Sequence, residues 1–329
     1  LPALLYYLAI FMSVHFEARR LGMHGLPRSE LPRLGEVLRE RGHLFLPLVI
    51  IIGVLVAGYS APFAALCGIA STIPTALLRA STRRYVRLGN LVEALEAGAR
   101  NTVTVALSCA CAGIVIGVIF LTGLGLEFTN LVLAAAGNHM LLALVLTMVA
   151  GIVLGMGMPT APAYIMQTAL LVPALVKLGV SVEAAHMFVF YFAILSAITP
   201  PVALAVYAAN GISRAQLWDS SVAALRLGAT GFIIPFMFVF GPSLLMIGEP
   251  ATIVQTALTA TVGVICLAAG FSGYLLGRTS SWQRVLLLGA ALVLIKPGGL
   301  TDAIGATLVG IVVATQWLSA RAARGQQTG

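Results

Sequence analysis

Uncharged apolar runs of nearly membrane-spanning length recur along the whole chain, and they constrain its fold more than any other feature. A helix needs about 20 apolar residues to cross the hydrocarbon core of a bilayer. Of the 329 residues, 60% are hydrophobic and 9% are charged, whereas a soluble domain carries about 25% charged residues. The sequence therefore predicts an all-α integral membrane protein and excludes a soluble enzyme, a nucleic-acid-binding protein and a disordered chain.

Several of these runs are too short for a complete span or are interrupted by glycine and proline. Such segments are typical of re-entrant hairpins and discontinuous helices, in which irregular backbone lines a cavity. We expect the last run to divide into two pieces at Lys296 to Gly299. The runs are 1–16, 44–59, 61–78, 102–122, 131–154, 161–176, 187–209, 227–247, 252–276 and 285–318.

The excess of basic residues, 19 against 11 acidic for a formal net charge of +8, reflects topology, because most of them lie in short loops. Two polar stretches combine arginines with helical apolar spacing, and we predict helices on the cytoplasmic membrane surface; two ordinary loops are the alternative. The first is expected to follow Ser29 as its N-cap. The second is expected to start at Asn90, with Glu93 completing a capping box. Segments 44–59 and 61–78 would then form an out-and-back pair.

The stretch LGMGMPTAPAY, residues 154–164, holds two glycines and two prolines between apolar arms at 139–154 and 163–176. A helix cannot continue through it, and we expect a re-entrant hairpin with its tip near mid-membrane. Unpaired backbone groups at that depth must face a cavity or a ligand. Carbonyl oxygens and the Thr160 hydroxyl suit a monovalent cation, whereas the N–H groups of the helix after Pro159 suit an anion.

A second break, SAITPPVA at residues 196–203, interrupts an otherwise apolar run. Two successive prolines cannot continue the preceding helix, so carbonyl groups are freed beside the hydroxyls of Ser196 and Thr199. Two interrupted segments about forty residues apart are the pattern expected at the midplane site of a transporter. Ordinary proline kinks are the alternative.

Polar side chains at membrane depth are further candidates, because an amide or phenol there needs a partner. Tyr164, Gln167 and Tyr191 are predicted to line the cavity, with hydrogen bonding between helices as the alternative. His186 is expected near the headgroups, on a helix capped by Ser181; a proton-relay or substrate role is the alternative. The spans contain almost no carboxylates, which favours sodium over protons as the coupling ion.

The run GMGMPTAPAYIMQTALLVPALVKLGVSVEAAHMFVFYFAILSAITPPVALAVYAANGIS, residues 155–213, closely resembles the C-terminal half of the large membrane subunit of TRAP (tripartite ATP-independent periplasmic) transporters. The resemblance is to the TAXI subclass, in which the small and large membrane subunits are often fused. LPALLYYLAIFMSVHFEARRLG and AGARNTVTVALSCACAGIVIGVIFLTGLG upstream are similar to the same subclass. The similarity covers nearly the whole chain and is weakest after about residue 250.

This resemblance implies a multi-pass permease subunit in the bacterial inner membrane. It would import a small organic anion, a carboxylate in most relatives, with sodium as the coupling ion and no cofactor. Its implied partners are a periplasmic substrate-binding protein and a small membrane subunit fused upstream. An ion-conducting channel and a non-catalytic structural subunit are the alternatives, and no enzyme activity is expected because the sequence carries no motif of an intramembrane enzyme.

The implied fold is a multi-span helical transporter of the elevator type, built from two inverted repeats that each hold a re-entrant hairpin and a discontinuous helix. Residues 155–160 match the second hairpin tip and residues 199–201 the second helix break. By that match, the candidates for sodium and substrate binding are Gly155, Gly157, Thr160, Ser196 and Thr199, and the residues that shape the breaks are Pro159, Pro200 and Pro201.

Nothing in the chain matches the first repeat, so we expect the chain to be the second half of a longer polypeptide. Its expected parts are a membrane helix end and surface helix (1–43), a membrane pair with the second surface helix (44–101), half of the transport domain (102–220) and C-terminal membrane helices (221–329). The two surface helices resemble the arms that tie a scaffold to a mobile domain.

Overall fold

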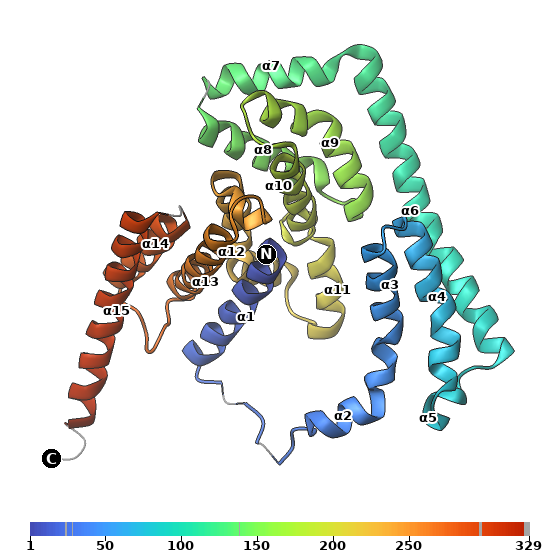
Figure 1. Cartoon of the computed structure of the whole chain (residues 1–329), viewed down its shortest axis with the longest axis horizontal. Helices are drawn as coiled ribbons and strands as arrows, with labels where there is room; N and C mark the ends of the chain where they lie inside the picture. Colours follow the sequence, from blue (N-terminus) through green and yellow to red (C-terminus); the bar gives the residue numbers. More distant parts are fainter. Residues whose placement is uncertain (24, 28, 138, 296–297, 326–329) are drawn as a thin grey trace. The chain divides into compact units, whose positions relative to one another are not determined.

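The structure is a computed structural model that describes residues 1–23, 25–27, 29–137, 139–295 and 298–325; for residues 104, 295 and 319–325 it describes the backbone alone. These residues form helices joined by short connections (Figure 1). They contain no β-strand, only an isolated bridge between Tyr274 and Arg278. The all-α class predicted from the apolar runs is therefore confirmed.

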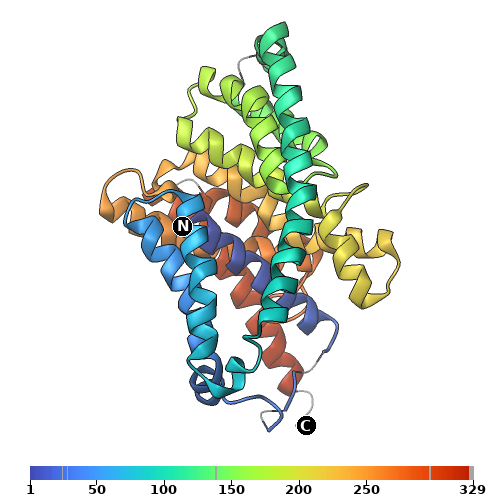
Figure 2. The same cartoon turned by 90° about the vertical axis from the view of Figure 1, so that its right-hand side faces the viewer.

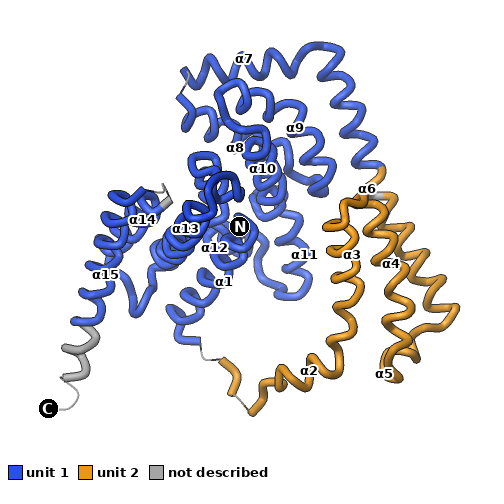
Figure 3. Tube along the Cα trace, in the orientation of Figure 1, with its two compact units in different colours: residues 1–24, 107–329 blue, residues 25–106 orange. Residues whose placement is uncertain are grey.

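The chain divides into two compact units, residues 25–106 and residues 1–24 with 107–329 (Figure 3).

In the unit of residues 25–106, prolines lie in the first turns of α3 and α4, where a missing N–H costs no helical hydrogen bond. Its elements are α2 (Leu34–Arg41), η1 (Gly42–Phe45), α3 (Leu46–Val56), α4 (Ala61–Leu77), α5 (Ala80–Arg83) and the start of α6 (Leu88–Thr122).

The two polar stretches begin elsewhere than the sequence predicted. α2 has Arg33 as its N-cap, so the expected N-cap at Ser29 is wrong. The cause is Pro32, because a proline disfavours helical angles at the residue before it.

The second stretch is part of α6, which starts at Leu88 and continues to Thr122. The capping box at Asn90 is therefore wrong; the Asn90 amide instead donates to the Tyr85 carbonyl at 3.0 Å. No proline interrupts the sequence where a separate surface helix was expected to end, and Arg100 pairs with Glu96 one turn earlier at 2.7 Å.

In the second unit, α7 to α10 pack against one another, and α12 and α13 pack beside α1 (Figure 1, Figure 2). The predicted division of the last apolar run is confirmed, since α14 ends at Ile295 and α15 begins at Gly299; Lys296 and Pro297 lie outside the described residues. The elements are α1 (Pro2–Arg20), α7 (Leu124–Ala136), α8 (Met140–Gly155), α9 (Thr160–Lys177), α10 (Val182–Leu195), η2 (Ser196–Ile198), α11 (Leu204–Ser213), α12 (Leu217–Phe240), η3 (Pro242–Leu245), α13 (Pro250–Ser272), α14 (Ser281–Ile295) and α15 (Gly299–Gly325).

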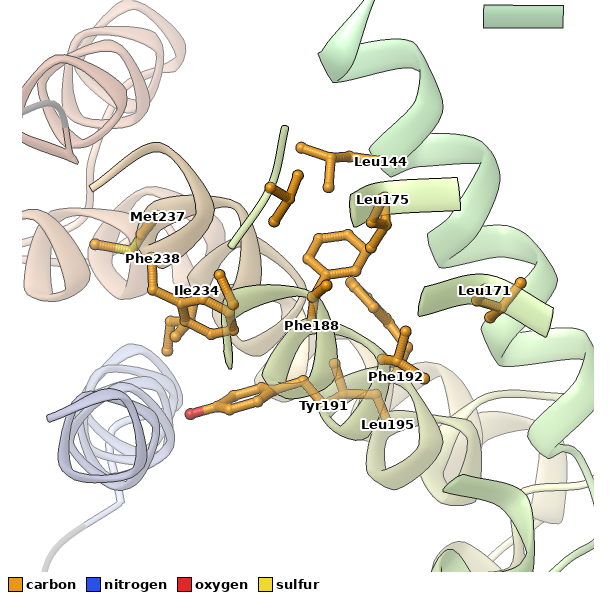
Figure 4. Close-up of a cluster of buried hydrophobic side chains, with 14 of the residues drawn as sticks. Leu144, Leu171, Leu175, Phe188, Tyr191, Phe192, Leu195, Ile234, Met237 and Phe238 are labelled. Carbon is orange, nitrogen blue, oxygen red and sulfur yellow. The ribbon is translucent and has the colours of Figure 1, made fainter. Parts of the chain in front are cut away.

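The core of this unit is centred on α10 (Figure 4). Phe188 and Phe192 stack edge to face with ring centroids 4.8 Å apart, and Phe188 packs in the same way on Phe236 of α12 at 5.3 Å. Such aromatic pairs add about 0.5–1.5 kcal/mol to the gain from burial. α10 is therefore held on two sides, and the break that follows it starts from a fixed helix.

Four of the described helices are long and apolar enough to cross a membrane: Leu88–Thr122, Leu217–Phe240, Pro250–Ser272 and Gly299–Leu318. Many large apolar side chains are exposed, including Leu121 at 90% and Ile212 at 89%. An apolar exterior of this extent is stable in lipid and not in water.

Candidate functional site

The hairpin tip, residues 155–160, joins α8 to α9 by a tight turn. α8 ends at Gly155, and Met156 leaves the helix with extended angles. Gly157 has φ +76°, a left-handed conformation that glycine adopts without strain. The Met158 N–H donates to the Gly155 carbonyl at 3.3 Å, and α9 begins at Thr160, directly after Pro159. The helix interruption that the sequence predicted is thus present.

The break, residues 196–203, follows α10. One turn of 3-10 helix covers Ser196–Ile198, Thr199 is extended, and the peptide bond between Pro200 and Pro201 is cis. A helix resumes only at Leu204. The two prolines therefore separate α10 from α11, as their lack of N–H groups requires.

The tip and the break lie against each other. A Cβ atom built on Gly155 would lie 2.5 Å from Ser196 Oγ and 2.9 Å from Ser196 Cβ, so only glycine fits this position. A Cβ built on Gly157 would lie 3.4 Å from Cγ1 of Val202, which belongs to the break. Residues about forty positions apart in the sequence are thus brought together.

Gln167 of α9 also packs against Gly155, next to Ser196. Its side chain is fully buried, and its Nε2 donates to the Gly151 carbonyl of α8 at 2.8 Å. The same nitrogen would lie 2.8 Å from a Cβ on Gly155. Its Oε1 is buried and has no hydrogen-bond partner in the described part of the chain. A buried amide oxygen without a donor is costly, so a donor or cation that reached this atom would be bound favourably.

The hydroxyl groups of the break donate to their own helix. Ser196 Oγ donates to the Ala193 carbonyl at 2.8 Å, and Thr199 Oγ1 donates to the Leu195 carbonyl at 2.7 Å. A hydroxyl that has committed its one hydrogen can still accept through its lone pairs. Toward any ligand, both groups are therefore acceptors.

Backbone carbonyls of the break add further acceptors. In a turn of 3-10 helix, the carbonyls of Ala197 and Ile198 would accept from the third residue along, which is Pro200 and Pro201 respectively. Neither proline has an N–H. Residues 154–164 and 196–203 also contain no charged or histidine side chain, so any charge on a ligand would be met by dipoles alone.

The start of α9 has the opposite polarity. No side chain caps this helix end, and Pro162 in its first turn has no N–H. Among the described residues, the N–H groups of Thr160 and Ala161 have no acceptor within the helix or from a capping side chain, and they lie at the positive end of a helix dipole, an arrangement that favours anions. Thr160 itself is half-buried.

Of the two tyrosines proposed as cavity-lining residues, Tyr191 lines a cavity of about 260 Å³ together with Tyr6, whereas Tyr164 bonds between helices. The Tyr164 hydroxyl is 2.8 Å from Nδ1 of His186, which links α9 to α10, so the alternative of bonding between helices describes it. Ser181 caps α10 as expected, accepting from Ala184 N at 3.3 Å. Tyr191 points its hydroxyl toward α1 (Figure 4), where its ring packs edge to face on Tyr6 at 6.2 Å.

The face of α8 that makes this contact possible was not among the predicted features. Thr147, Gly151 and Gly155 are buried at spacings of four residues, so they form one stripe on the helix. A Cβ on Gly151 would lie 3.4 Å from Phe192 Cβ of α10. Small residues at this spacing are the known means of bringing membrane helices close, and the spacing was visible in the sequence.

Broken helices packed tip to break, with backbone acceptors and donors free to meet a ligand, are the arrangement found in membrane transport proteins. A family model described as "Tripartite ATP-independent periplasmic transporter, DctM component" matches residues 1–251. The chain belongs to this family: it is a multi-pass permease of a TRAP-type secondary transporter, and the DctM component works with a substrate-binding protein and a small membrane subunit. The family resemblance found in the sequence is confirmed; the TAXI subclass stays a prediction. Searches of curated proteins and of solved structures found no match.

Proposed function

We propose that this chain imports a small organic anion, a carboxylate, in symport with sodium, and that both ligands bind where the tip meets the break. The observation that carries the proposal is the fit of Gly155 against Ser196 beside the buried amide of Gln167. Two discontinuous segments that meet with unpaired backbone groups are the arrangement that transporters use for ions and substrates.

The sodium ion is assigned to the acceptor side of the contact. Its ligands would come from the carbonyls of the tip and the break, with the hydroxyls of Thr160, Ser196 and Thr199. Neutral oxygen ligands suit a hard monovalent cation. The hydroxyl hydrogens of Ser196 and Thr199 are already donated to backbone carbonyls, so only the lone pairs of these oxygens can point toward the cation. Pro159, Pro200 and Pro201 would shape this surface without binding.

The carboxylate is assigned to the donor side. The N–H groups of Thr160 and Ala161 at the start of α9 would bind one carboxylate oxygen each, aided by the helix dipole. A cation bound to the neighbouring carbonyls would attract the same carboxylate, which gives a physical reason for coupling: each ligand raises the affinity for the other.

The wider organisation belongs to the same proposal. We assign the chain to the bacterial inner membrane, to the TAXI subclass with a small membrane subunit fused upstream, and to an elevator mechanism in which a mobile domain carries the site past a scaffold. The substrate would be delivered by a periplasmic binding protein, as the family assignment requires a binding-protein partner.

The test measures uptake into proteoliposomes that contain the permease with its small membrane subunit and carry the binding protein outside. Uptake of the organic acid is compared with and without an inward sodium gradient. The double variant Thr160→Ala plus Thr199→Ala is expected to lower uptake at least tenfold and to raise the sodium concentration for half-maximal rate.

The matched control is Thr168→Ala, which removes another α9 hydroxyl that only donates to its own helix, to the Tyr164 carbonyl at 2.7 Å. It should leave sodium dependence unchanged. Sodium-independent uptake by the unmodified protein would refute symport. Equal losses in the control and the double variant would refute the assignment of sodium to the tip and the break.

A further inference from the structure

An arginine-lined cavity lies far along the chain from the tip and the break, at the end of α1 and the connection between α13 and α14. Its volume is about 340 Å³. Arg20 and Leu21 contribute from α1, and the remaining lining comes from residues 273–284. We name this cavity the arginine cavity; its lining residues are Arg20, Leu21, Gly273, Arg278, Thr279 and Arg284.

The positive charge in the arginine cavity is only partly neutralised by the described residues. Arg20 pairs with Glu17, and that carboxylate is shared with Arg226. No acidic residue occurs between Glu249 and Asp302, so Arg278 and Arg284 have no counter-ion on their own segment. Three guanidinium groups around one cavity repel one another unless an anion lies between them.

Several donors that line the cavity are unused. Arg284 is held by its bonds from Nε to the Gly270 carbonyl at 2.9 Å and from Nη2 to the Phe271 carbonyl at 3.2 Å, which leaves three of its five N–H donors. Arg20 Nε and Thr279 Oγ1 are buried without a hydrogen-bond partner among the described residues. Arginine forks and a hydroxyl around an uncompensated positive charge are the donor set that binds a phosphate group.

The position of the cavity favours the phosphate of a lipid over a free phosphate ion. α1 ends and α14 begins at this level, and Trp282 in the first turn of α14 is half-exposed, as is typical of tryptophan at the headgroup level of a membrane. Leu21 lines the cavity and is 64% exposed, and the neighbouring Leu276 is 61% exposed, so apolar surface adjoins the arginines. By the positive-inside rule, Arg19 and Arg20 place this end on the cytoplasmic side.

We propose that the arginine cavity binds the phosphate of an anionic phospholipid from the cytoplasmic leaflet. The bound headgroup would bridge α1 to the turn between α13 and α14. Basic pockets between membrane helices on this side bind acidic headgroups in general. The site is independent of sodium and of the transported anion, and its role is to fasten these helices to the membrane.

The experiment titrates the purified permease in detergent with phosphatidylglycerol or phosphatidylcholine and follows its apparent Tm. Phosphatidylglycerol is expected to raise the Tm saturably, and phosphatidylcholine is not. Arg278→Gln should raise the half-saturating phosphatidylglycerol concentration at least about tenfold, because a hydrogen bond to a charged group is worth about 1.5–3 kcal/mol and about 1.4 kcal/mol corresponds to a factor of ten. Arg278 suits the test because its side chain has no hydrogen bond or ion pair in the described residues.

Arg19→Gln is the matched control, because it removes the same charge one residue away from the cavity lining and should not change the midpoint. Thr279→Val, which keeps the side-chain shape, should weaken binding without affecting the Tm of the lipid-free protein. Equal shifts for Arg278→Gln and Arg19→Gln would overturn the proposal in favour of unspecific surface attraction. A Tm rise of the same size with inorganic phosphate alone would overturn it in favour of a free-phosphate site.

Discussion

Replacement of Gly155 by alanine tests the contact between the tip and the break most directly. The added methyl would lie 2.5 Å from Ser196 Oγ, 2.9 Å from Ser196 Cβ and 2.8 Å from Gln167 Nε2, all shorter than the 3.4 Å at which ordinary contact begins. Ser196 Oγ is fixed by its bond to the Ala193 carbonyl, and its Cβ cannot retreat by side-chain rotation. The backbone of the break must therefore move by about 0.5 Å or more.

The expected magnitude follows from two opposed effects. Overpacking a filled interior costs about 1–3 kcal/mol, and the better helix propensity of alanine returns at most about 1 kcal/mol. We therefore expect Gly155→Ala to destabilise the protein by about 1–2 kcal/mol. At about 2–4 °C per kcal/mol for a domain of this size, the apparent Tm should fall by roughly 2–8 °C, and uptake should fall because the site is displaced.

The assay is thermal unfolding of the purified permease, with uptake into proteoliposomes measured on the same variants. Gly289→Ala is the matched control, since Gly289 lies inside α14 and a Cβ there would meet nothing within 4 Å. This variant gains the helix propensity of alanine without the steric clash that is expected at residue 155. Ser196→Gly should partly rescue Gly155→Ala, giving a favourable coupling energy in a double-mutant cycle. If Gly155→Ala is as stable and active as Gly289→Ala, the described contact is refuted.

Three further variants probe the neighbouring bonds. Gln167→Leu removes the donor to the Gly151 carbonyl and should lower the free energy of unfolding by about 1 kcal/mol. It should also slow sodium-dependent uptake, and a loss of uptake no larger than that of another variant with the same Tm would argue against a ligand role. Tyr164→Phe should lower the free energy of unfolding by about 0.5–1.5 kcal/mol. The same change should have no effect in a protein in which His186 is already replaced by Asn. Ser181→Ala should cost about 1 kcal/mol by loss of the N-cap, whereas Ser181→Asp should retain stability; unfolding of both variants decides this.

The two helix breaks were predictable because proline and glycine act locally. The expected arms at 139–154 and 163–176 differ by a few residues at most from α8 and α9, and the break at residues 196–203 lies between α10 and α11 as expected. A missing N–H or a left-handed angle stops a helix whatever surrounds it. The sequence thereby located both halves of the candidate site, without showing that they touch.

What escaped prediction depends on the surroundings. The change from polar to apolar composition near residue 101 indicates a boundary, but α6 continues through it, because composition alone does not end a helix. The contact of Gly155 with Ser196 and the bond from Tyr164 to His186 join residues on different helices. Such partners follow from how helices pack, and a single sequence carries little information about that.

The fit at Gly155 also distinguishes a carbon side chain from an ion. A methyl carbon needs about 3.5 Å to an oxygen atom, whereas a hard cation binds an oxygen at about 2.3–2.6 Å. The crowding that excludes a side chain at residue 155 therefore does not exclude a small cation held by Ser196 Oγ and nearby carbonyls. Glycine at this position keeps the tip and the break close enough for oxygens of both segments to share one ion.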